Sequence, residues 1–268
     1  MESLLYFHFL TNFDETMDNI ESFHDSIYAQ KGIAIFIDGD NIKGDYIDDI
    51  IKEASKYGQV IMKRVYGDWN KMKEWSTKVH EYSLTPCQIF PNTKNKNATD
   101  LALAVDLIDI LHDGLFDGYC IISSDGDFTI LAQRVKEHKK FVLGMGAQTT
   151  PKSFQSACNR FVFLDNIISN KPKKKKATDE GKNSVSEKQI FSKEDLLFML
   201  DEAYEKVEND DGYAHLSQIV GYLQTYDPGF DYRNYGVKKA IELVRMFPKN
   251  FEIYRTKSGS GTVKIKKK

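Results

Sequence analysis

The chain has 268 residues, of which 41% are hydrophobic and 28% are charged, and its net charge is −2. This composition is typical of a soluble chain with one large domain or two smaller ones. No apolar run approaches the roughly 20 residues of a membrane-spanning helix, and the N-terminus lacks the basic-then-apolar order of a signal peptide. We therefore expect a cytoplasmic protein with no membrane partner.

The cysteines are isolated in the sequence at Cys87, Cys120 and Cys158, and none of them forms a CxxC pair. This spacing argues against a disulfide framework and against a structural zinc site. Buried free thiols are expected instead.

Residues 1–30 contain several acidic and aromatic side chains but no Lys or Arg. We interpret them as an acidic N-terminal extension. A single helix and a mobile segment are both consistent with its weak pattern.

From Lys31 onward, apolar runs alternate with amphipathic stretches. The predicted strands are residues 33–37, 60–66, 86–91, 119–123 and 141–143, with a last strand at the end of 154–163. The predicted helices are residues 46–57, 71–82, 99–112 and 128–137, with a short one at the start of 154–163. This alternation predicts right-handed βαβ units and an α/β three-layer sandwich around a parallel sheet.

The first predicted strand ends abruptly in Asp38-Gly-Asp-Asn41. Because ligands of open α/β sheets bind beyond the carboxyl ends of the strands, Asp38, Asp40 and Asn41 are expected at the ligand crevice. The alternative is a simple turn, since these residue types dominate turns.

A second acidic position, Asp100, begins the helix predicted at residues 99–112. Helical spacing places it on the sheet-facing side with Leu103, Leu107 and Leu111. Asp106, Asp109 and Asp113 are predicted to point the other way. The alternative role for Asp100 is a helix cap or a partner of the helix dipole.

A third acidic segment, Ser124-Asp125-Gly-Asp127, directly follows the strand predicted at residues 119–123. The first and fourth strands of a doubly wound sheet can be neighbours, so Asp38 and Asp125 are expected to face each other. Clustered carboxylates raise each other's pKa unless a cation neutralises them. Oxygen ligands suit Mg²⁺ or Mn²⁺, which would support hydrolysis of a phosphodiester.

Residues 169–190 lose the apolar pattern and carry a lysine run, which predicts a basic linker. A solvated tether and a contact with an anionic polymer are both open. Residues 191–268 then show helical patterns at 193–207, 215–224 and 235–246, followed by extended segments at 251–255 and 262–266. Three helices and a terminal hairpin predict a small winged-helix domain.

Three ordered motifs, IAIFIDGDN, KNATDLALAVD and CIISSDGDF, resemble the NYN family of PIN-like ribonucleases in its bacterial LabA-like branch. The resemblance spans about residues 31–165, within a predicted nuclease domain of residues 31–168. It implies a PIN-like Rossmannoid fold and a Mg²⁺- or Mn²⁺-dependent endoribonuclease, a hydrolase with catalytic Asp38, Asn41, Asp100, Asp125 and Asp127. The same resemblance implies that the four aspartates bind the metal, that Asn41 orients a water or a backbone contact, and that Ser124 supports the turn. Asp40 falls at a variable family position and is left outside this set.

The terminal unit is similar to a LOTUS (OST-HTH) domain along LLFMLDEAY, the HLSQIV to RMFP stretch and the closing hairpin. Domains of that family bind RNA, including structured or G-rich RNA, or helicase partners. The candidate RNA contacts are Arg64, Lys94 and Lys96 in the first domain and Arg233, Tyr235, Lys238, Lys239, Arg255, Lys257, Lys264 and Lys266 in the second.

Two other functions are weighed against the ribonuclease. One is a non-catalytic RNA-binding regulator that retains the acidic pocket. The other is a phosphatase of the haloacid-dehalogenase type, which is disfavoured because Asn41 directly follows Asp40 and no DxDx[TV] motif is present. A homodimer formed through a sheet edge stays open as well.

Overall fold

The computed structural model of the chain describes residues 31–90, 97–168, 192–255 and 262–268. The acidic extension, the basic linker, Lys94, Lys96 and Lys257 lie outside the described residues. None of the helices in the described ranges has the length and hydropathy needed to cross a membrane.

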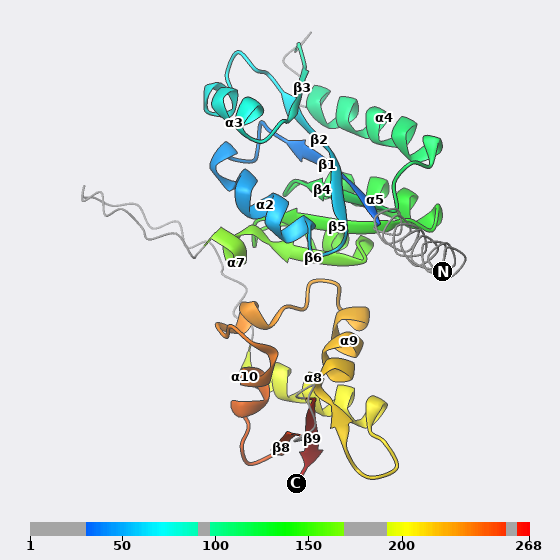
Figure 1. Cartoon of the computed structure of the whole chain (residues 1–268), viewed down its shortest axis with the longest axis vertical. Coiled ribbons are helices and arrows are strands. Elements are labelled where there is room, and N and C mark those ends of the chain that lie inside the picture. Colours follow the sequence, from blue (N-terminus) through cyan, green and yellow to red (C-terminus); the bar gives the residue numbers. More distant parts are fainter. Residues whose placement is uncertain (1–30, 91–96, 169–191, 256–261) are drawn as a thin grey trace, which may run out of the picture.

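A parallel sheet forms the centre of the first unit, with the strand order β3-β2-β1-β4-β5-β6 within the described residues (Figure 1). The strands are β1 (Gly32–Asp38), β2 (Gln59–Gly67), β3 (Thr85–Gln88), β4 (Gly118–Ile122), β5 (Phe141–Gly146) and β6 (Arg160–Phe163). Strand β1 is buried along its whole length and pairs in parallel with both β2 and β4. The prediction that the first and fourth strands are adjacent in the sheet is therefore confirmed.

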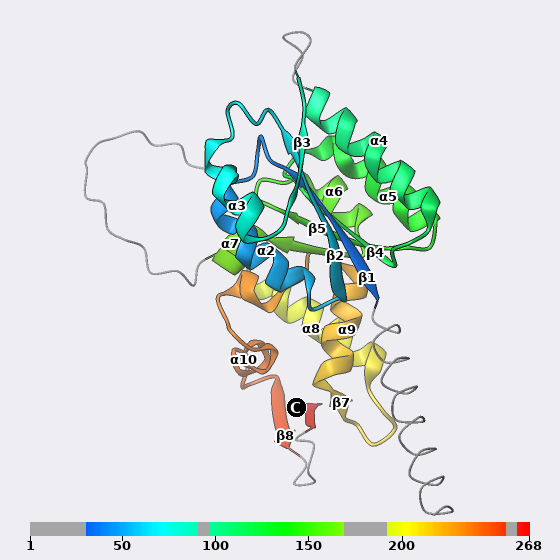
Figure 2. The same ribbon diagram turned by 45° about the horizontal axis from the view of Figure 1, so that its top comes forward.

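Helices cover both faces of this sheet, as Figures 1 and 2 show. They are α2 (Ile47–Ala54), α3 (Ser76–Glu81), α4 (Ala98–Asp113), α5 (Thr129–Glu137), α6 (Lys152–Ala157) and α7 (Leu164–Ile168). Alternate side chains of β1 point to opposite faces, so Ile35 packs in one apolar cluster and Phe36 in the other. Burial on both faces explains the unbroken apolar run of this strand. The predicted three-layer α/β sandwich is confirmed.

Strand β5 runs three residues further than predicted, to Gly146. The sequence does not reveal this extension, because two of the three residues Gly144-Met145-Gly146 are glycines. Close packing against β6 explains the need for glycine here. A Cβ on Gly144 would lie 2.5 Å from the ring of Phe161 on β6. Helix α7 was not predicted, since the apolar pattern fades where it begins.

The second unit contains α8 (Lys193–Val207), α9 (Leu216–Tyr226) and α10 (Ala240–Arg245) with the strands β7 (Ala214–His215), β8 (Phe251–Arg255) and β9 (Val263–Lys267). The strands form an antiparallel sheet in the order β7-β9-β8, which confirms the winged-helix prediction. The third helix is shorter than predicted. Residues Tyr232–Tyr235 form a 3-10 turn that ends at Gly236, whose φ is 77°. Helix α10 begins only at Ala240.

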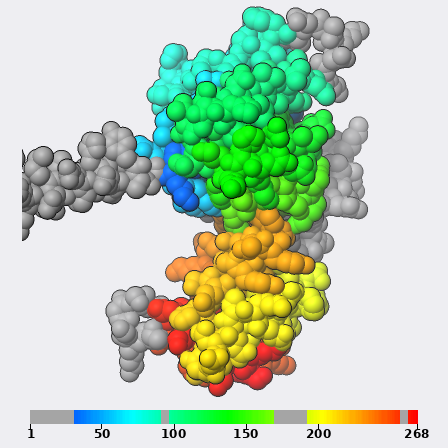
Figure 3. All heavy atoms as spheres, turned by 90° about the vertical axis from the view of Figure 1, so that its right-hand side faces the viewer, coloured from blue at the N-terminus to red at the C-terminus, as the bar shows by residue number. Residues whose placement is uncertain are grey.

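The second unit contacts the first at the exposed edge of β6. The Phe161 amide donates to the Pro228 carbonyl at 2.8 Å, and Arg160 Nη1 donates to the Phe230 carbonyl at 2.9 Å. Lys152 forms an ion pair with Asp227 at 2.8 Å. Figure 3 shows the orange part of the second unit packed against the green lower edge of the first. The chain thus covers its own sheet edge, which is one way in which native proteins protect edge strands.

Arg233 is the central ion-pairing residue of this contact. Its guanidinium lies 3.1 Å from Glu53 on α2 and 2.5 Å from Asp231 of its own unit. The side chains of Glu53 and Asp231 are only 5% and 4% exposed. Two carboxylates that are nearly excluded from water therefore share one arginine, and Glu53 has a second ion pair with Lys56 at 2.6 Å.

Candidate active site

Asp38 is the last residue of β1 and is fully buried. One of its carboxylate oxygens accepts hydrogen bonds from Asn41 Nδ2 and from Ser123 Oγ, each at 2.8 Å. Among the described residues, no hydrogen-bond donor reaches the other oxygen. Burial raises the pKa of Asp38, and the hydrogen bonds from Asn41 and Ser123 offset only part of this rise. A buried carboxylate oxygen without a donor is costly unless a further group satisfies it.

The turn after β4 brings the second carboxylate pair to the neighbouring strand end. Ser123 Oγ accepts a hydrogen bond from the Asp125 amide at 3.1 Å, so one hydroxyl links Asp38 to this turn. Asp125 accepts from the Asp127 amide at 2.9 Å and caps the 3-10 turn that precedes α5. Ser124 Oγ accepts from the Ala147 amide, which fixes the turn against the end of β5.

Asp100 projects from the first turn of α4 toward the same place. The pKa of Asp100 is raised to about 6. Burial is the main cause, and the negative charges of nearby aspartates add to it, with the largest effect from Asp38, followed by Asp125, Asp127 and Asp40. The repulsion indicates that the acidic side chains from three distant segments share one electrostatic environment.

The glycine of the Asp-Gly-Asp motif meets a steric requirement. A Cβ on Gly39 would lie 2.2 Å from the Met72 methyl and 2.9 Å from the Tyr66 carbonyl. The loop can therefore pass β2 only with glycine at this position. Asp40, in turn, accepts hydrogen bonds from Thr99 Oγ1 at 2.7 Å and from the Asp68 amide at 3.2 Å. It joins the loop to the start of α4 and thereby helps to position Asp100.

A metal centre is not preformed in the described residues, because no group of three His, Cys, Asp or Glu side chains is close enough together to hold an ion. The donor set nevertheless fits a hard divalent cation. It consists of carboxylate oxygens, includes an oxygen of Asp38 that lacks a donor, and carries the excess negative charge that raises the pKa of Asp100.

One prediction about α4 is wrong. Asp106 does not point away from the sheet but accepts hydrogen bonds from Arg64 and from the hydroxyl of Tyr66 on β2. Asp109 and Asp113 are exposed, as predicted. The reason is that the long side chains of β2 reach past the helix, which helical spacing alone does not reveal. The guanidinium of Arg64, a candidate RNA contact, is thus already engaged by a carboxylate.

The candidate RNA contacts of the second unit fall into different environments. Lys238, Lys239 and Arg255 are exposed. Lys264 lies 3.6 Å from Asp211 and 5.6 Å above the ring of Tyr213. Tyr235 is partly buried and packs on Phe230, and Arg233 is held between the two units as described above.

Two further site residues were not singled out from the sequence. Ser123 is fully buried and connects Asp38 to the Asp125 turn, whereas the family resemblance implies a role only for its neighbour Ser124. Thr99 is 7% exposed and holds Asp40. The order of strand and turn could have pointed to Ser123, because it is the last residue before the chain leaves the sheet. No sequence signal distinguishes Thr99.

Replacing Asp100 with Asn is expected to stabilise the metal-free protein. Between pH 3.8 and about 6 the folded state retains a proton on Asp100 that the unfolded chain loses. The free energy of unfolding therefore falls as the pH rises through this window. At neutral pH we expect Asp100→Asn to raise it by about 1–2 kcal/mol, less than the full pKa difference because the site is partly solvated.

Urea unfolding in EDTA at several pH values checks this expectation, with the exposed Asp109→Asn on the same helix as the control. Equal pH dependence in wild type and Asp100→Asn would contradict the proposed carboxylate repulsion.

In this parallel sheet β1 ends in Asp38, the turn after the neighbouring β4 carries Asp125, and the first turn of α4 carries Asp100. Residues 32–165, half of the chain, match the family model of the NYN domain, and the chain belongs to this family. Residues 190–263 match the OST-HTH/LOTUS domain.

Two solved structures resemble part of the chain. A protein of unknown function from Vibrio parahaemolyticus is 19% identical with a TM-score of 0.44, and the match covers 51% of this chain and 94% of that one. An uncharacterised protein from Nitrosomonas europaea is 24% identical with a TM-score of 0.25, covering 37% of this chain and 92% of that one. No curated protein sequence matches the chain.

Proposed function

We propose that the protein is a divalent-metal-dependent endoribonuclease whose second unit captures the RNA. The observation that carries the proposal is the pairing of a buried Asp38, one oxygen of which lacks a donor, with an Asp100 whose pKa is raised by the surrounding aspartates. Such a site gains stability from a cation and is costly without one.

Asp38, Asp100, Asp125 and Asp127 are the residues that would hold Mg²⁺ or Mn²⁺. Held there, the ion would supply positive charge for the phosphate oxygens and would lower the pKa of a water molecule. Asn41 and Ser123 fix the Asp38 carboxylate through one oxygen, and this leaves the other oxygen for ligation. Thr99 and Asp40 hold the start of α4 at the site, so that Asp100 keeps its orientation.

The second unit is proposed to bind RNA through the exposed Lys238, Lys239, Arg255 and Lys266 together with Lys264. Beside Lys264, the Lys266 ammonium lies 5.3 Å above the ring of Tyr213, which packs edge-on against Tyr254 at 5.2 Å. Aromatic rings beside lysines suit stacked bases and phosphates. Because the two units are joined in one chain, captured RNA is concentrated near the carboxylates. Arg233 and Arg64 are left out of this surface, since carboxylates already engage their guanidinium groups.

Incubating labelled structured, G-rich and single-stranded RNA with the full chain in Mg²⁺, Mn²⁺ or EDTA tests the proposal. We expect cleavage with either metal and none with EDTA. RNA that is retained but left intact under all three conditions would contradict the enzyme and would favour the non-catalytic RNA-binding regulator.

A further inference from the structure

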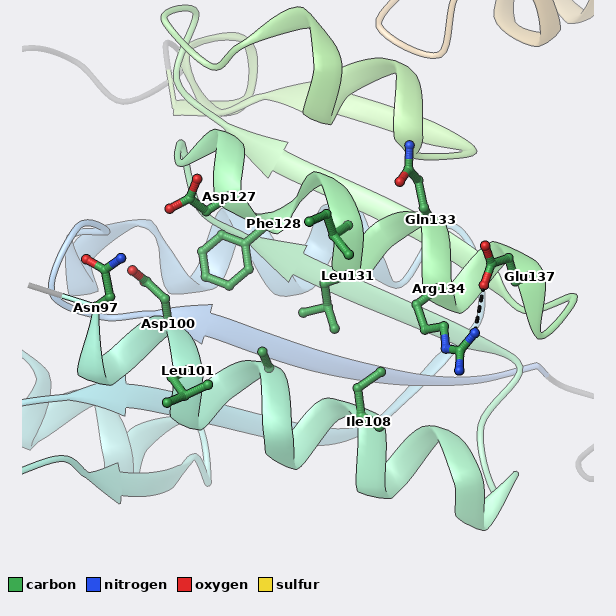
Figure 4. A pocket seen from close by; sticks show the side chains of 12 residues that line it. Asn97, Asp100, Leu101, Ile108, Asp127, Phe128, Leu131, Gln133, Arg134 and Glu137 are labelled. Atoms are coloured by element: carbon green, nitrogen blue, oxygen red, sulfur yellow. Dashed lines mark hydrogen bonds and ion pairs between the residues drawn. The ribbon is translucent and has the colours of Figure 1, made fainter.

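A groove of about 740 Å³ runs between α4 and α5 and opens at the carboxylates. Figure 4 shows Asp100 and Asp127 at one end of it and the ion pair between Arg134 and Glu137 at the other. Its size is that of a pocket for a small organic group rather than for a single ion.

The walls of this groove are apolar and open to solvent. Leu101 on α4 is 66% exposed, and Ile130 on α5 is 76% exposed. Ala104, Phe128 and Leu131 also line the groove. Large apolar side chains gathered beside a polar site mark a place where a ligand binds.

The charges of the groove select the kind of ligand. Arg134 is the cation among the described residues that line it, and Glu137 neutralises this arginine at 3.0 Å. The groove is therefore unsuited to the phosphates of a nucleic acid but suited to an uncharged group with apolar faces. Asn97 and Gln133, which also line it, offer amide donors and acceptors.

We propose that this groove between α4 and α5 seats the unpaired base next to the scissile bond. The inference rests on the proposed ribonuclease function, because a phosphodiester cleaved at a cation that Asp100 and Asp127 would hold has its neighbouring nucleoside at the mouth of the groove. A base within a duplex is stacked and paired and enters only if it is flipped out, which costs a few kcal/mol.

A peptide helix laid into the groove is the competing occupant. It is less well matched, because one end of the helix would be seated against two aspartates that the metal site requires. The outcomes below separate the two.

Filling the groove with Ala104→Phe is the first test. We expect kcat/KM for Mn²⁺-dependent cleavage of a short labelled single-stranded RNA to fall about tenfold to a hundredfold, the range of one stacked base. Val105→Phe on the same helix is the matched control, since Val105 is 54% exposed and does not line the groove; it should leave cleavage unchanged.

A milder double variant tests the groove in case Ala104→Phe fails to fold. Leu101→Ala combined with Ile130→Ala removes both exposed walls and should lower kcat/KM in the same direction, whereas Leu115→Ala, 73% exposed and outside the groove, should not. An abasic site next to the cut should lower cleavage by the wild type and have little further effect in the double variant. Undiminished cleavage by these groove variants would overturn the inference while leaving the nuclease in place.

Crosslinking separates failure of the groove from failure of the enzyme. The full wild-type chain is irradiated in Ca²⁺ with the same RNA carrying 4-thiouridine, and the crosslinked peptides are mapped. Crosslinks within residues 97–108 or 128–137 support base seating even if no RNA is cleaved, in which case only the proposed activity fails. Crosslinks confined to other residues overturn the inference that the groove seats a base.

Discussion

Asp38→Asn is expected to abolish Mn²⁺-dependent RNA cleavage while leaving the fold intact. The carboxylate is fully buried, and burial raises its pKa. A neutral side chain of the same shape is therefore tolerated at this position. The amide retains one oxygen for the hydrogen bonds from Asn41 and Ser123, but it replaces the free oxygen with a donor that cannot bind a cation. We expect a loss of at least about a hundredfold in kcat/KM, comparable with removal of a key transition-state contact.

Initial cleavage rates in Mn²⁺, with thermal unfolding of the same samples, provide the measurement. Asp125→Asn should behave in the same way, whereas Asp113→Asn, an exposed acidic residue at the far end of α4, should retain full activity. Wild-type rates in both Asp38→Asn and Asp125→Asn would refute the assignment of these carboxylates.

Arg233→Ala is expected to give the largest loss of stability. The substitution leaves Glu53 and Asp231 without their shared cation, at 5% and 4% side-chain exposure. Breaking a buried ion pair in this way typically costs about 3–5 kcal/mol. The loss should fall mainly on the contact between the two units, because Glu53 belongs to α2 and Asp231 to the second unit.

Urea unfolding of the full chain measures the loss. Arg134→Ala is the matched control, because its ion pair with Glu137 has side chains that are 55% and 63% exposed and should contribute less than about 1 kcal/mol. Glu53 keeps its ion pair with Lys56 at 2.6 Å, so the charge of Asp231 is the one left uncompensated. Adding Asp231→Asn to Arg233→Ala removes that charge and should restore part of the stability. Equal losses in Arg233→Ala and Arg134→Ala would show that the interdomain ion pairs are not structural.

The sequence predicts the strand ends better than the contacts between elements. The sequence predicts Asp38 and Asp125 at neighbouring strand ends. The unbroken apolar run indicates a strand buried on both faces, and the Asp-Gly that follows indicates where the strand ends. The partner of Asp106 could not be predicted, since it depends on how far Arg64 and Tyr66 extend from β2. The packing of one unit on the other has no periodic signal either, and for that reason Arg233 resembled a basic surface residue.

The covered edge of β6 bears on how two copies of the chain could associate. The Phe161 amide and the Arg160 side chain already bond residues 228–230, so that pairing of two chains through β6 would require the second unit to leave. β3 forms the opposite edge of the sheet. We expect any homodimer built through the sheet to use that edge.

Calorimetric titration of the metal-free full chain with Mn²⁺ tests most directly whether the aspartates from three separate segments form one cation site. We predict saturable binding by the wild type that disappears in Asp38→Asn and survives in Asp113→Asn. Indistinguishable Mn²⁺ binding by the wild type and Asp38→Asn, or no binding by either, would contradict the site.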